Sequence, residues 1–453
     1  MNETIAAIAT PLGTAAIGVV RLSGPESLRI ARAIFFPRKA WRDDAPQSHR
    51  AYFGSLQHPQ TGAALDQGLF LWMREPHSYT GEDSVELHCH GGSFVLQAVL
   101  NACLLAGARL AEAGEFTQRA FINGKLDLVQ AEAVADLIHS RSEPGMALAA
   151  HQLEGQLSGQ LRQIRQQLIA MLATIEANID FPDEVDSPDY AAIEAELQVI
   201  QQAIRDLLAS ADSGRVWKQG LRLALVGTPN VGKSTLLNAL LRYERAIVSP
   251  IPGTTRDTVE DDYSLKGIPI RLIDTAGLRE SDDQIEAIGM ARSREALANA
   301  DLILLVSEAG QAIPSDLQQL VQSLSKPWVV QVENKQDLQN EMSAAPLQPD
   351  WPIYRISALQ QQGLEDLEAG LYQLITQKLN LSSPVSVNAR HSLCLVRAAE
   401  ALERMQETLQ QGLPGDFASI DLKEAIVAFG EVLGESISET VIHEIFHRFC
   451  VGK

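Results

Sequence analysis

The sequence predicts a multidomain chain with an α+β domain at the N-terminus, an all-α domain after it, and an α/β domain inserted into the all-α domain. A length of 453 residues exceeds what one hydrophobic core usually organises. Hydrophobic residues make up 45% and charged residues 21%, both near globular averages, so the whole length is expected to fold. The period of the apolar residues changes along the chain and divides it into residues 1–117, 118–215, 216–379 and 380–453.

The first 117 residues alternate short apolar segments with glycine and proline turns, which predicts a compact α+β domain. Ala16–Leu22 and Ser84–Cys89 are two such segments. The apolar start, Ile5–Val20, is interpreted as one buried strand and not as a secretory signal, because Glu3 occupies the region where such a signal is basic. The sequence has no apolar run of the roughly 18 residues that cross a bilayer, so no membrane association is expected.

A helical period begins in the second segment. Its apolar residues recur every three or four positions: Leu153, Leu157, Leu161, Ile164, Leu168, Leu172, Ile175 and Ile179. This pattern predicts one long amphipathic helix that ends before Pro182. Further helices are expected from about Tyr190 to Ala211, over Leu393–Leu409, and from Leu422 onward. Because each helical stretch has an apolar stripe, the two halves of the all-α domain are expected to pack together.

From Leu221 the chain alternates short apolar strands with helix-length polar segments, which predicts a doubly wound α/β domain. The expected strands are Leu221–Val226, Ile270–Ile273, Leu302–Val306, Val329–Val332 and Ile353–Ile356.

Charge and cysteine usage limit the function. A formal net charge of −20 repels phosphate backbones, so any RNA contact is expected to be local. The four cysteines lie far apart without a C-x-x-C spacing, which argues against a disulfide framework or a structural zinc site. A reducing cytoplasmic location is therefore expected.

A phosphate-binding loop follows the first strand of the α/β domain, where Gly227–Ser234 fits G-x-x-x-x-G-K-[ST]. Its glycines let the backbone wrap the phosphates with N–H groups directed inward. Lys233 is expected to reach the β and γ phosphates, and Ser234 and Thr255 are the expected protein ligands of Mg²⁺.

Three more motifs stand at strand ends in the same domain: Asp274–Gly277, Asn334–Asp337 and Ser357–Ala358. The carboxylate of Asp337 can accept two hydrogen bonds from the N1–H and 2-amino groups of guanine. Adenine has no such donor pair, so the motifs together predict a site for GTP.

The catalytic residue is less evident, because Leu278 stands where Ras-type GTPases keep a water-orienting glutamine. The nearby acidic candidates, in a stretch that also fits a solvated loop, are Glu280, Asp282, Asp283 and Glu286. Arg256 is a candidate arginine finger, although pairing with Asp257 explains it equally well.

The chain resembles the MnmE (TrmE) family of bacterial tRNA-modification GTPases over its whole length. The segments that carry the resemblance are Thr228–Ser234, Gly253–Asp257, Asp274–Leu278, Phe449–Lys453, Ser78–Asp83, Glu86–Gly92 and Gly114–Leu128. The resemblance implies a tetrahydrofolate-binding and dimerisation domain in front, a helical domain, and an inserted Ras-like P-loop GTPase domain. It also implies a homodimer whose two GTPase domains meet during hydrolysis.

The resemblance further implies site residues. A potassium ion would replace the arginine finger, and its ligands would be Asn230, Ser249, Ile251 and Thr254. The family's water-positioning acid falls on Glu286, and its C-terminal cysteine, a second catalytic candidate, falls on Cys450. Cys450 equally fits a buried cysteine on an amphipathic helix. A 5-formyl-tetrahydrofolate-type ligand would contact Arg21, Glu86, Lys125 and Lys453.

With the flavoprotein MnmG, the family adds an aminomethyl or carboxymethylaminomethyl group to position five of the wobble uridine in certain tRNAs. Motifs and resemblance together predict contacts to GTP from Asn230, Val231, Gly232, Lys233, Ser234, Thr235, Ser249, Pro250, Ile251, Pro252, Gly253, Thr254, Thr255, Asp274, Thr275, Ala276, Gly277, Asn334, Lys335, Asp337, Ser357 and Ala358.

Other functions remain as alternatives. His443–His447 fits the zinc-protease motif H-E-x-x-H, but only six residues follow it, and a helical apolar stripe explains Ile445 and Phe446. His88 and His90 could also bind a metal, although alternation along a strand explains them better. The alternative for the whole chain is a ribosome-associated regulatory GTPase of the Era type.

Overall fold

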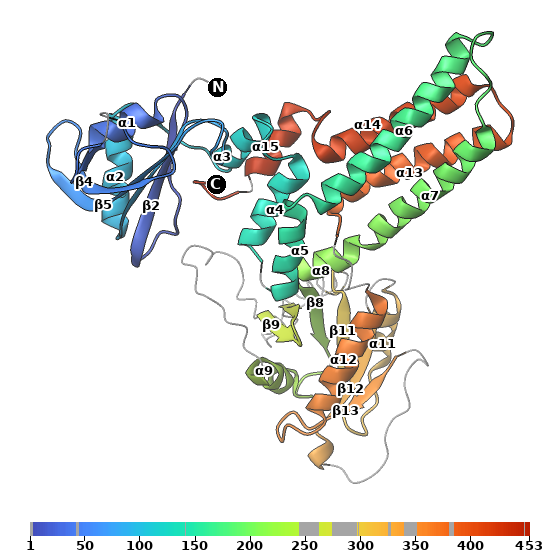
Figure 1. Cartoon of the computed structure of the whole chain (residues 1–453). Coiled ribbons are helices and arrows are strands. Elements are labelled where there is room, and N and C mark those ends of the chain that lie inside the picture. The colour runs from blue at the N-terminus through green and yellow to red at the C-terminus, as the bar shows by residue number, and fades with distance from the viewer. Residues whose placement is uncertain are drawn as a thin grey trace, which may run out of the picture.

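The computed structural model describes residues 3–41, 45–140, 142–243, 262–273, 297, 299–324, 328–338, 351–379, 385–447 and 449–453. Figure 1 shows an N-terminal domain of mixed strands and helices, a group of long helices beside it, and an α/β domain below the helices. The C-terminal segment, in red, lies beside helices of the middle of the chain. The predicted multidomain class with an inserted α/β domain is therefore confirmed.

The N-terminal domain is built on a seven-stranded sheet of order β3-β4-β5-β6-β2-β1-β7. The strands are β1 (Ile5–Ile8), β2 (Ala15–Ser23), β3 (Phe35–Pro37), β4 (Ala51–Gln57), β5 (Ala64–Met73), β6 (Ser84–Gly91) and β7 (Arg109–Leu110). The single strand predicted over Ile5–Val20 is wrong, because the chain turns after Ile8 and β2 returns antiparallel to β1. Pro11 lies in this turn, and proline cannot donate to a strand ladder.

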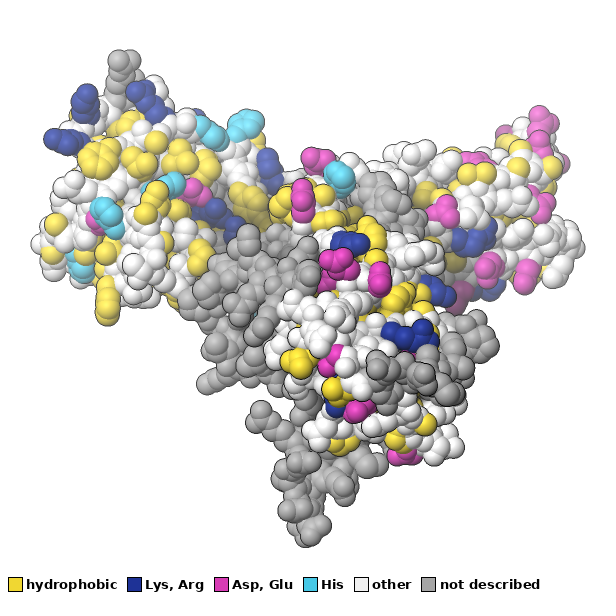
Figure 2. All heavy atoms as spheres, turned by 90° about the horizontal axis from the view of Figure 1, so that it is seen from below, with side chains coloured by type: hydrophobic (Ala, Val, Ile, Leu, Met, Phe, Trp, Pro, Cys, Tyr) yellow, Lys and Arg dark blue, Asp and Glu magenta, His cyan; other side chains and the backbone are white. Residues whose placement is uncertain are grey.

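Two helices, α1 (Ser27–Ile34) and α2 (Ser93–Leu105), cover one face of this sheet and share its hydrophobic core. Several apolar side chains outside that core are exposed: Ile17 by 62%, Phe36 by 46%, Phe53 by 45% and Leu69 by 40%. Phe53 and Leu69 are partners in the β4–β5 ladder. Figure 2 shows hydrophobic side chains among basic and histidine side chains on this domain. We call these four residues the open apolar face.

The helical domain comes from both halves of the chain. Its helices are α3 (Glu115–Ile122), α4 (Leu128–Ile138), α5 (Glu143–Leu153), α6 (Gln156–Asp180), α7 (Tyr190–Ala209), α8 (Ala211–Gln219), α13 (Ala389–Gln410), α14 (Gly415–Leu433) and α15 (Glu439–His447). The single helix predicted from Leu153 is wrong at its start, because Gly155 has a left-handed φ of 86° between α5 and α6. Its end is as predicted, since α6 stops at Asp180. Within the described residues, no helix has the length and apolarity needed to cross a membrane.

The two halves share one hydrophobic core, in which residues of α6 and α7 contact residues of α13 and α14. A charged cluster joins them as well. Glu132 of α4 accepts hydrogen bonds from Arg390 at 2.8 and 3.0 Å and lies 2.7 Å from Nε2 of His391. Burial alone would raise the pKa of Glu132, but His391 and Arg390 outweigh it and hold this pKa well below its usual value. Burial lowers the pKa of His391.

The α/β domain has a six-stranded sheet of order β13-β12-β11-β8-β10-β9. The strands are β8 (Leu221–Val226), β9 (Asp262–Leu265), β10 (Ile268–Ile273), β11 (Leu302–Glu308), β12 (Trp328–Asn334) and β13 (Ile353–Arg355), and the helices are α9 (Lys233–Tyr243), α11 (Ser315–Gln322) and α12 (Leu364–Lys378). Each predicted strand is present, and all run parallel except β9, which sequence reasoning missed. Separate apolar clusters lie on the two faces, as in a doubly wound domain.

The short helix α8 links the α/β domain to the helical domain. Asp301, before β11, accepts hydrogen bonds from Arg215 of α8 at 2.9 and 3.0 Å and from Arg222 of β8 at 3.1 Å. Burial would raise the pKa of Asp301, but both arginines hold it below its usual value. On the other side, Lys218 of α8 forms an ion pair of 2.7 Å with Asp136 of α4. Helix α8 is therefore bonded to both domains.

We expect Glu132→Ala to destabilise the helical domain by about 3 kcal/mol, because it leaves the Arg390 and His391 side chains without their carboxylate. Calorimetry should show a lower Tm for the transition of this domain. Glu403→Ala, an exposed carboxylate on α13, is the matched control and should change stability by less than about 0.5 kcal/mol. Equal stability of the two variants would contradict a role of Glu132 in joining the halves.

Candidate functional site

The predicted phosphate-binding loop connects β8 to α9, and its backbone needs special residues. Gly232 has a φ of 92° and Asn230 a φ of 63°, both left-handed. A Cβ atom at Gly232 would lie 2.3 Å from Nδ2 of Asn334, and one at Gly227 would lie 2.2 Å from the carbonyl oxygen of Val306. Both positions of the motif therefore require glycine, because Val306 and Asn334 lie too close to the loop for a side chain.

Lys233 is the first residue of α9, and its ammonium group lies over the loop. Nζ donates hydrogen bonds of 2.8 Å to the carbonyl oxygens of Gly227 and Thr228. Burial lowers the pKa of Lys233. Ser234 and Thr235 follow in the first turn of α9 with exposed side chains. The positive end of the helix and the ammonium group therefore face the same loop, an arrangement suited to phosphate.

Asn334, the last residue of β12, connects three of the predicted motifs. Its side chain is buried, Nδ2 donates a hydrogen bond of 2.8 Å to the carbonyl oxygen of Val231, and Oδ1 accepts one of 3.0 Å from the backbone N–H of Ala358. Ser357 donates a hydrogen bond of 2.5 Å to Oδ1 of Asp337. The motifs at Gly227, Asn334 and Ser357, each expected at a strand end, thus meet at one edge of the sheet.

Sequence reasoning missed Glu308, which contacts the predicted residue Lys335. Lys335 has a left-handed φ of 64°, and its Nζ lies 2.8 Å from Oε2 of Glu308 at the end of β11. Glu308 belongs to no motif, so its signal is only its position two residues after the predicted strand Leu302–Val306. Carboxyl ends of neighbouring parallel strands meet at the same edge, and this places Glu308 beside Lys335.

The rest of the predicted nucleotide site lies outside the described residues, and its role stays a prediction. These positions are Ser249, Pro250, Ile251, Pro252, Gly253, Thr254, Thr255, Asp274, Thr275, Ala276, Gly277 and Glu286.

A second group of predicted residues lies on the sheet of the N-terminal domain. Arg21 of β2 and Glu86 of β6 are ladder partners, and Nε of Arg21 donates a hydrogen bond of 3.0 Å to Oε1 of Glu86. His88 lies 3.1 Å from Oε2 of Glu86. The contact with His88, aided by the charge of Arg21, outweighs burial and holds the pKa of Glu86 below its usual value. The guanidinium group lies 5.8 Å from the ring centroids of Tyr79 and Phe116.

Residues 449–453 bring Lys453 to this place. Val451 bridges to Ala113, and the carbonyl oxygen of Lys453 accepts a hydrogen bond of 3.2 Å from the N–H of Phe116. Burial lowers the pKa of Lys453, and the charge of Arg21 lowers it further. The structure thus gathers Arg21, Glu86 and Lys453, as the resemblance implies.

Two other predicted residues lie nearby. Lys125 donates a hydrogen bond of 3.1 Å to the carbonyl oxygen of Pro76, on the loop that carries Tyr79. Cys450 is exposed and follows the end of α15, so its interpretation as a buried helical cysteine is wrong. Its carbonyl oxygen accepts a hydrogen bond of 3.4 Å from Gly114, because the chain leaves the helix here to bind the N-terminal domain.

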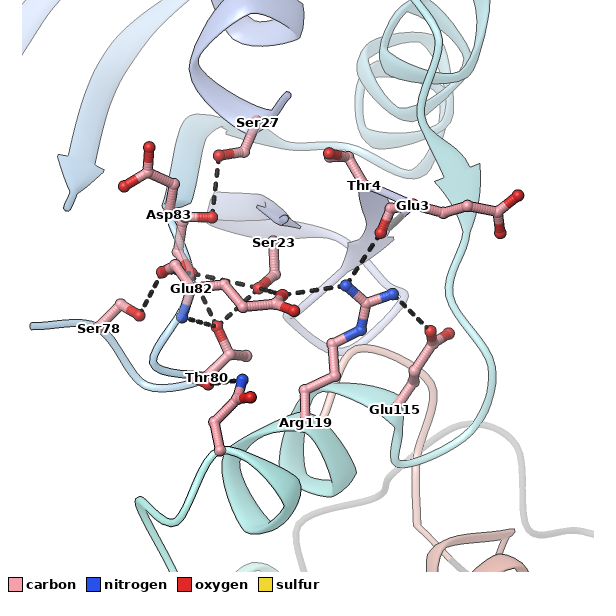
Figure 3. A network of polar contacts seen from close by, with 12 residues as sticks. Glu3, Thr4, Ser23, Ser27, Ser78, Thr80, Glu82, Asp83, Glu115 and Arg119 are labelled. Carbon is pink, nitrogen blue, oxygen red and sulfur yellow. Dashed lines mark hydrogen bonds and ion pairs between the residues drawn. The ribbon is translucent and has the colours of Figure 1, made fainter. Parts of the chain in front are cut away.

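Figure 3 shows the polar network beside this group, in which two of the N-terminal motif segments meet. The side chain of Arg119 is 1% exposed and forms ion pairs of 3.0 Å with Glu82 and 2.9 Å with Glu115. Glu82 also accepts a hydrogen bond of 2.8 Å from Ser23. These residues hold the loop of Tyr79 against the helix of Phe116, and so fix the two rings that flank Arg21.

The histidines of the H-E-x-x-H segment and of β6 have surroundings that their places on a helix and a strand explain. His443 and His447 lie on the exposed side of α15 with ring centroids 5.9 Å apart, while Phe446 is buried in an apolar cluster. His88 and His90 contact Glu86 and Asp66, respectively, on alternate positions of β6. Among the residues that the structure describes, no three His, Cys, Asp or Glu side chains are grouped to hold a metal ion.

Comparison with known proteins covers the chain from end to end. The model for the MnmE helical domain matches residues 128–450, and the model for the GTP-binding protein TrmE N-terminus matches residues 4–125. A tRNA modification GTPase MnmE of Acaryochloris marina is 44% identical over 458 residues, with all of both chains covered. One of Synechococcus elongatus is 45% identical, covering 100% of this chain and 99% of the relative. One of Heliobacterium modesticaldum is 42% identical, with both chains fully covered. The chain therefore belongs to the MnmE family of tRNA modification GTPases.

Proposed function

We propose that this GTPase uses GTP hydrolysis, together with the flavoprotein MnmG, to add an aminomethyl or carboxymethylaminomethyl group to position five of a tRNA wobble uridine. A tetrahydrofolate one-carbon unit would supply the added carbon. The observation that carries the proposal is the pair of ligand-like sites on one chain: the nucleotide motifs joined by Asn334, and the charged group around Arg21. The Era-type regulatory alternative gives no role to the second site.

The nucleotide would bind with its phosphates on the loop before α9 and its base at Asp337. Lys233 would exchange its two carbonyl partners for phosphate oxygens. The hydroxyl of Ser234 is the hard oxygen ligand that Mg²⁺ prefers, and bound there the ion would neutralise charge on the β and γ phosphates. Ser357 donates to one oxygen of Asp337, which would keep the carboxylate in place for a guanine edge.

Hydrolysis would depend on potassium and on Glu286. Support comes from Asn230, whose left-handed backbone and exposed side chain put an amide oxygen at the rim of the phosphate loop. An ion held there by Asn230, Ser249, Ile251 and Thr254 would offset transition-state charge as an arginine finger does. Glu286 would orient the attacking water, the task that Leu278 cannot perform.

The folate ligand would bind at Arg21, Glu86, Lys125 and Lys453. The carboxylate of Glu86 suits the N–H donors of a pterin, and the ammonium groups of Lys125 and Lys453 suit the carboxylates of a glutamate tail. The ring of Tyr79, which is only partly buried, lies beside Arg21, and a flat heterocycle can pack on it, while Phe116 is buried on the inner side of the guanidinium group. Cys450, which is exposed and stands three residues before Lys453, would be the candidate thiol for the chemistry.

The protein would act as a homodimer built through its N-terminal domains. The open apolar face supports this, since grouped exposed apolar side chains mark sites of protein association. The same domain carries the charged group of Arg21, so dimer formation and ligand binding would involve neighbouring parts of one sheet.

Changing Asp337 to asparagine should exchange the nucleotide preference. The amide can donate a hydrogen bond to the 2-oxo group of xanthine, whereas it meets the 2-amino group of guanine with a second donor. GTP affinity should fall by at least about 100-fold and affinity for xanthosine triphosphate should rise, as measured by competition with a fluorescent nucleotide. Asp316→Asn, exposed on α11, is the matched control. An unchanged preference would remove Asp337 from base recognition.

GTP turnover should be at least about tenfold faster in potassium than in sodium at equal ionic strength. Asn230→Ala should abolish the difference between the salts. Glu286→Ala should keep nucleotide affinity and lose turnover in both. Phosphate release at saturating GTP measures all three, and equal wild-type rates in the two salts would refute the potassium site.

Reconstitution with MnmG, tRNA, GTP and a folate labelled on its one-carbon unit should place the label on the wobble uridine. Glu86→Gln should lose the transfer of label but keep GTP hydrolysis, because Glu86 lies on a different domain from the nucleotide motifs. Label that never reaches the uridine would exclude folate as donor. Unchanged wobble nucleosides in a deletion strain would favour the Era-type alternative.

A further inference from the structure

We propose that Glu308 is a positioning residue for guanine-nucleotide binding, because it holds the side chain of Lys335 in the place where the base binds. The inference rests on the proposed GTP site and adds a residue that the motifs do not include. Its central observation is the ion pair of 2.8 Å between Nζ of Lys335 and Oε2 of Glu308, whose side chains are 28% and 27% exposed.

The backbone fixes both partners of this ion pair. Strands β11 and β12 run parallel with Glu308 opposite Asn334, and the N–H of Ala309 donates a hydrogen bond of 2.8 Å to the carbonyl oxygen of Asn334. The left-handed backbone of Lys335 then directs neighbouring side chains to different partners. Asn334 binds Val231 and Ala358, while Lys335 binds Glu308.

The position of Lys335 explains why its restraint matters for a nucleotide. Lys335 lies in sequence between Asn334, which is bonded to the phosphate loop, and Asp337, which is bonded to Ser357. Thr228 of the phosphate loop and Glu308 line one small cavity, so the ion pair stands at the border of that loop. A base that reaches from the loop to Asp337 would therefore run beside Lys335.

A lysine side chain without this ion pair would pack less favourably on a flat ring. Its four-carbon side chain has many rotamers, and ordering it during binding opposes affinity. The ion pair restricts the side chain of Lys335 before the nucleotide arrives, so less freedom is lost when its apolar stem packs on the ring. Glu308 thus acts through Lys335 and need not touch the nucleotide.

The test is Glu308→Gln, which keeps the shape and removes the charge. KM for GTP and Kd for GDP should rise by about two- to fivefold, the range for a partly exposed ion pair, while kcat stays within about twofold. The difference from wild type should shrink in high salt, because screening weakens the wild-type pair. Glu403→Gln, which removes one exposed carboxylate from α13, is the matched control for net charge.

A double-mutant cycle assigns the effect to Lys335. In a Lys335→Ala background, Glu308→Gln should cause no further loss of affinity. Unchanged affinity in the single variant, an effect that persists without Lys335, or a lower Tm with unchanged KM would each overturn the inference. Failure of the GTP site itself gives a different result: wild type that does not bind GTP, or Asp337→Asn with the wild-type nucleotide preference.

Discussion

The contact of Glu132 with Arg390 and His391 fixes how the two halves of the helical domain are oriented on each other, and the placement of the inserted domain depends on that orientation. An inserted α/β domain separates the two halves of the helical domain in sequence, so those halves must recognise each other without help from chain connectivity. The shared apolar core supplies most of the driving force, but it is not directional. The charged cluster is directional: one carboxylate fixes α4 against the first turn of α13, and Arg390 also donates to the carbonyl oxygens of Glu431 and Val432 at the end of α14.

Because the two halves of the helical domain pack together, both chain connections of the inserted domain start from the same packed helices. Helix α8 is bonded to β8 and β11 through Asp301, and to α4 through Lys218. Gln152 of α5 also donates to the carbonyl oxygen of Ser386, directly before α13. A displacement of the strands that carry the nucleotide motifs therefore acts on α8 and, through it, on α4 and α5 of the helical domain.

Local patterns in the sequence predicted more of the fold than of the site. Apolar runs bounded by loops identified the strands from Leu221 onward, since buried parallel strands are apolar on both faces. The same patterns missed β9, a short edge strand, and α8, whose residues are mostly polar. Periodicity could not detect the break at Gly155, because the apolar stripe continues across it. Motifs at strand ends identified Gly232, Asn334 and Ser357, whereas Glu308 pairs with a residue that follows the neighbouring strand and carries no local signal.

The docking of residues 449–453 onto the N-terminal domain has a consequence for folding. Arg21 and Lys453 come together only when the segment after α15 docks on the N-terminal domain, so their contact joins residues more than 400 positions apart. Contacts between residues so distant in sequence form late and lower the rate of folding. A small molecule that binds both residues therefore distinguishes the completely folded chain from its partly folded forms. By mass action the bound molecule would shift the folding equilibrium of the N-terminal and helical domains together. Ligand binding at Arg21 and Lys453 would thus couple the stabilities of the two domains.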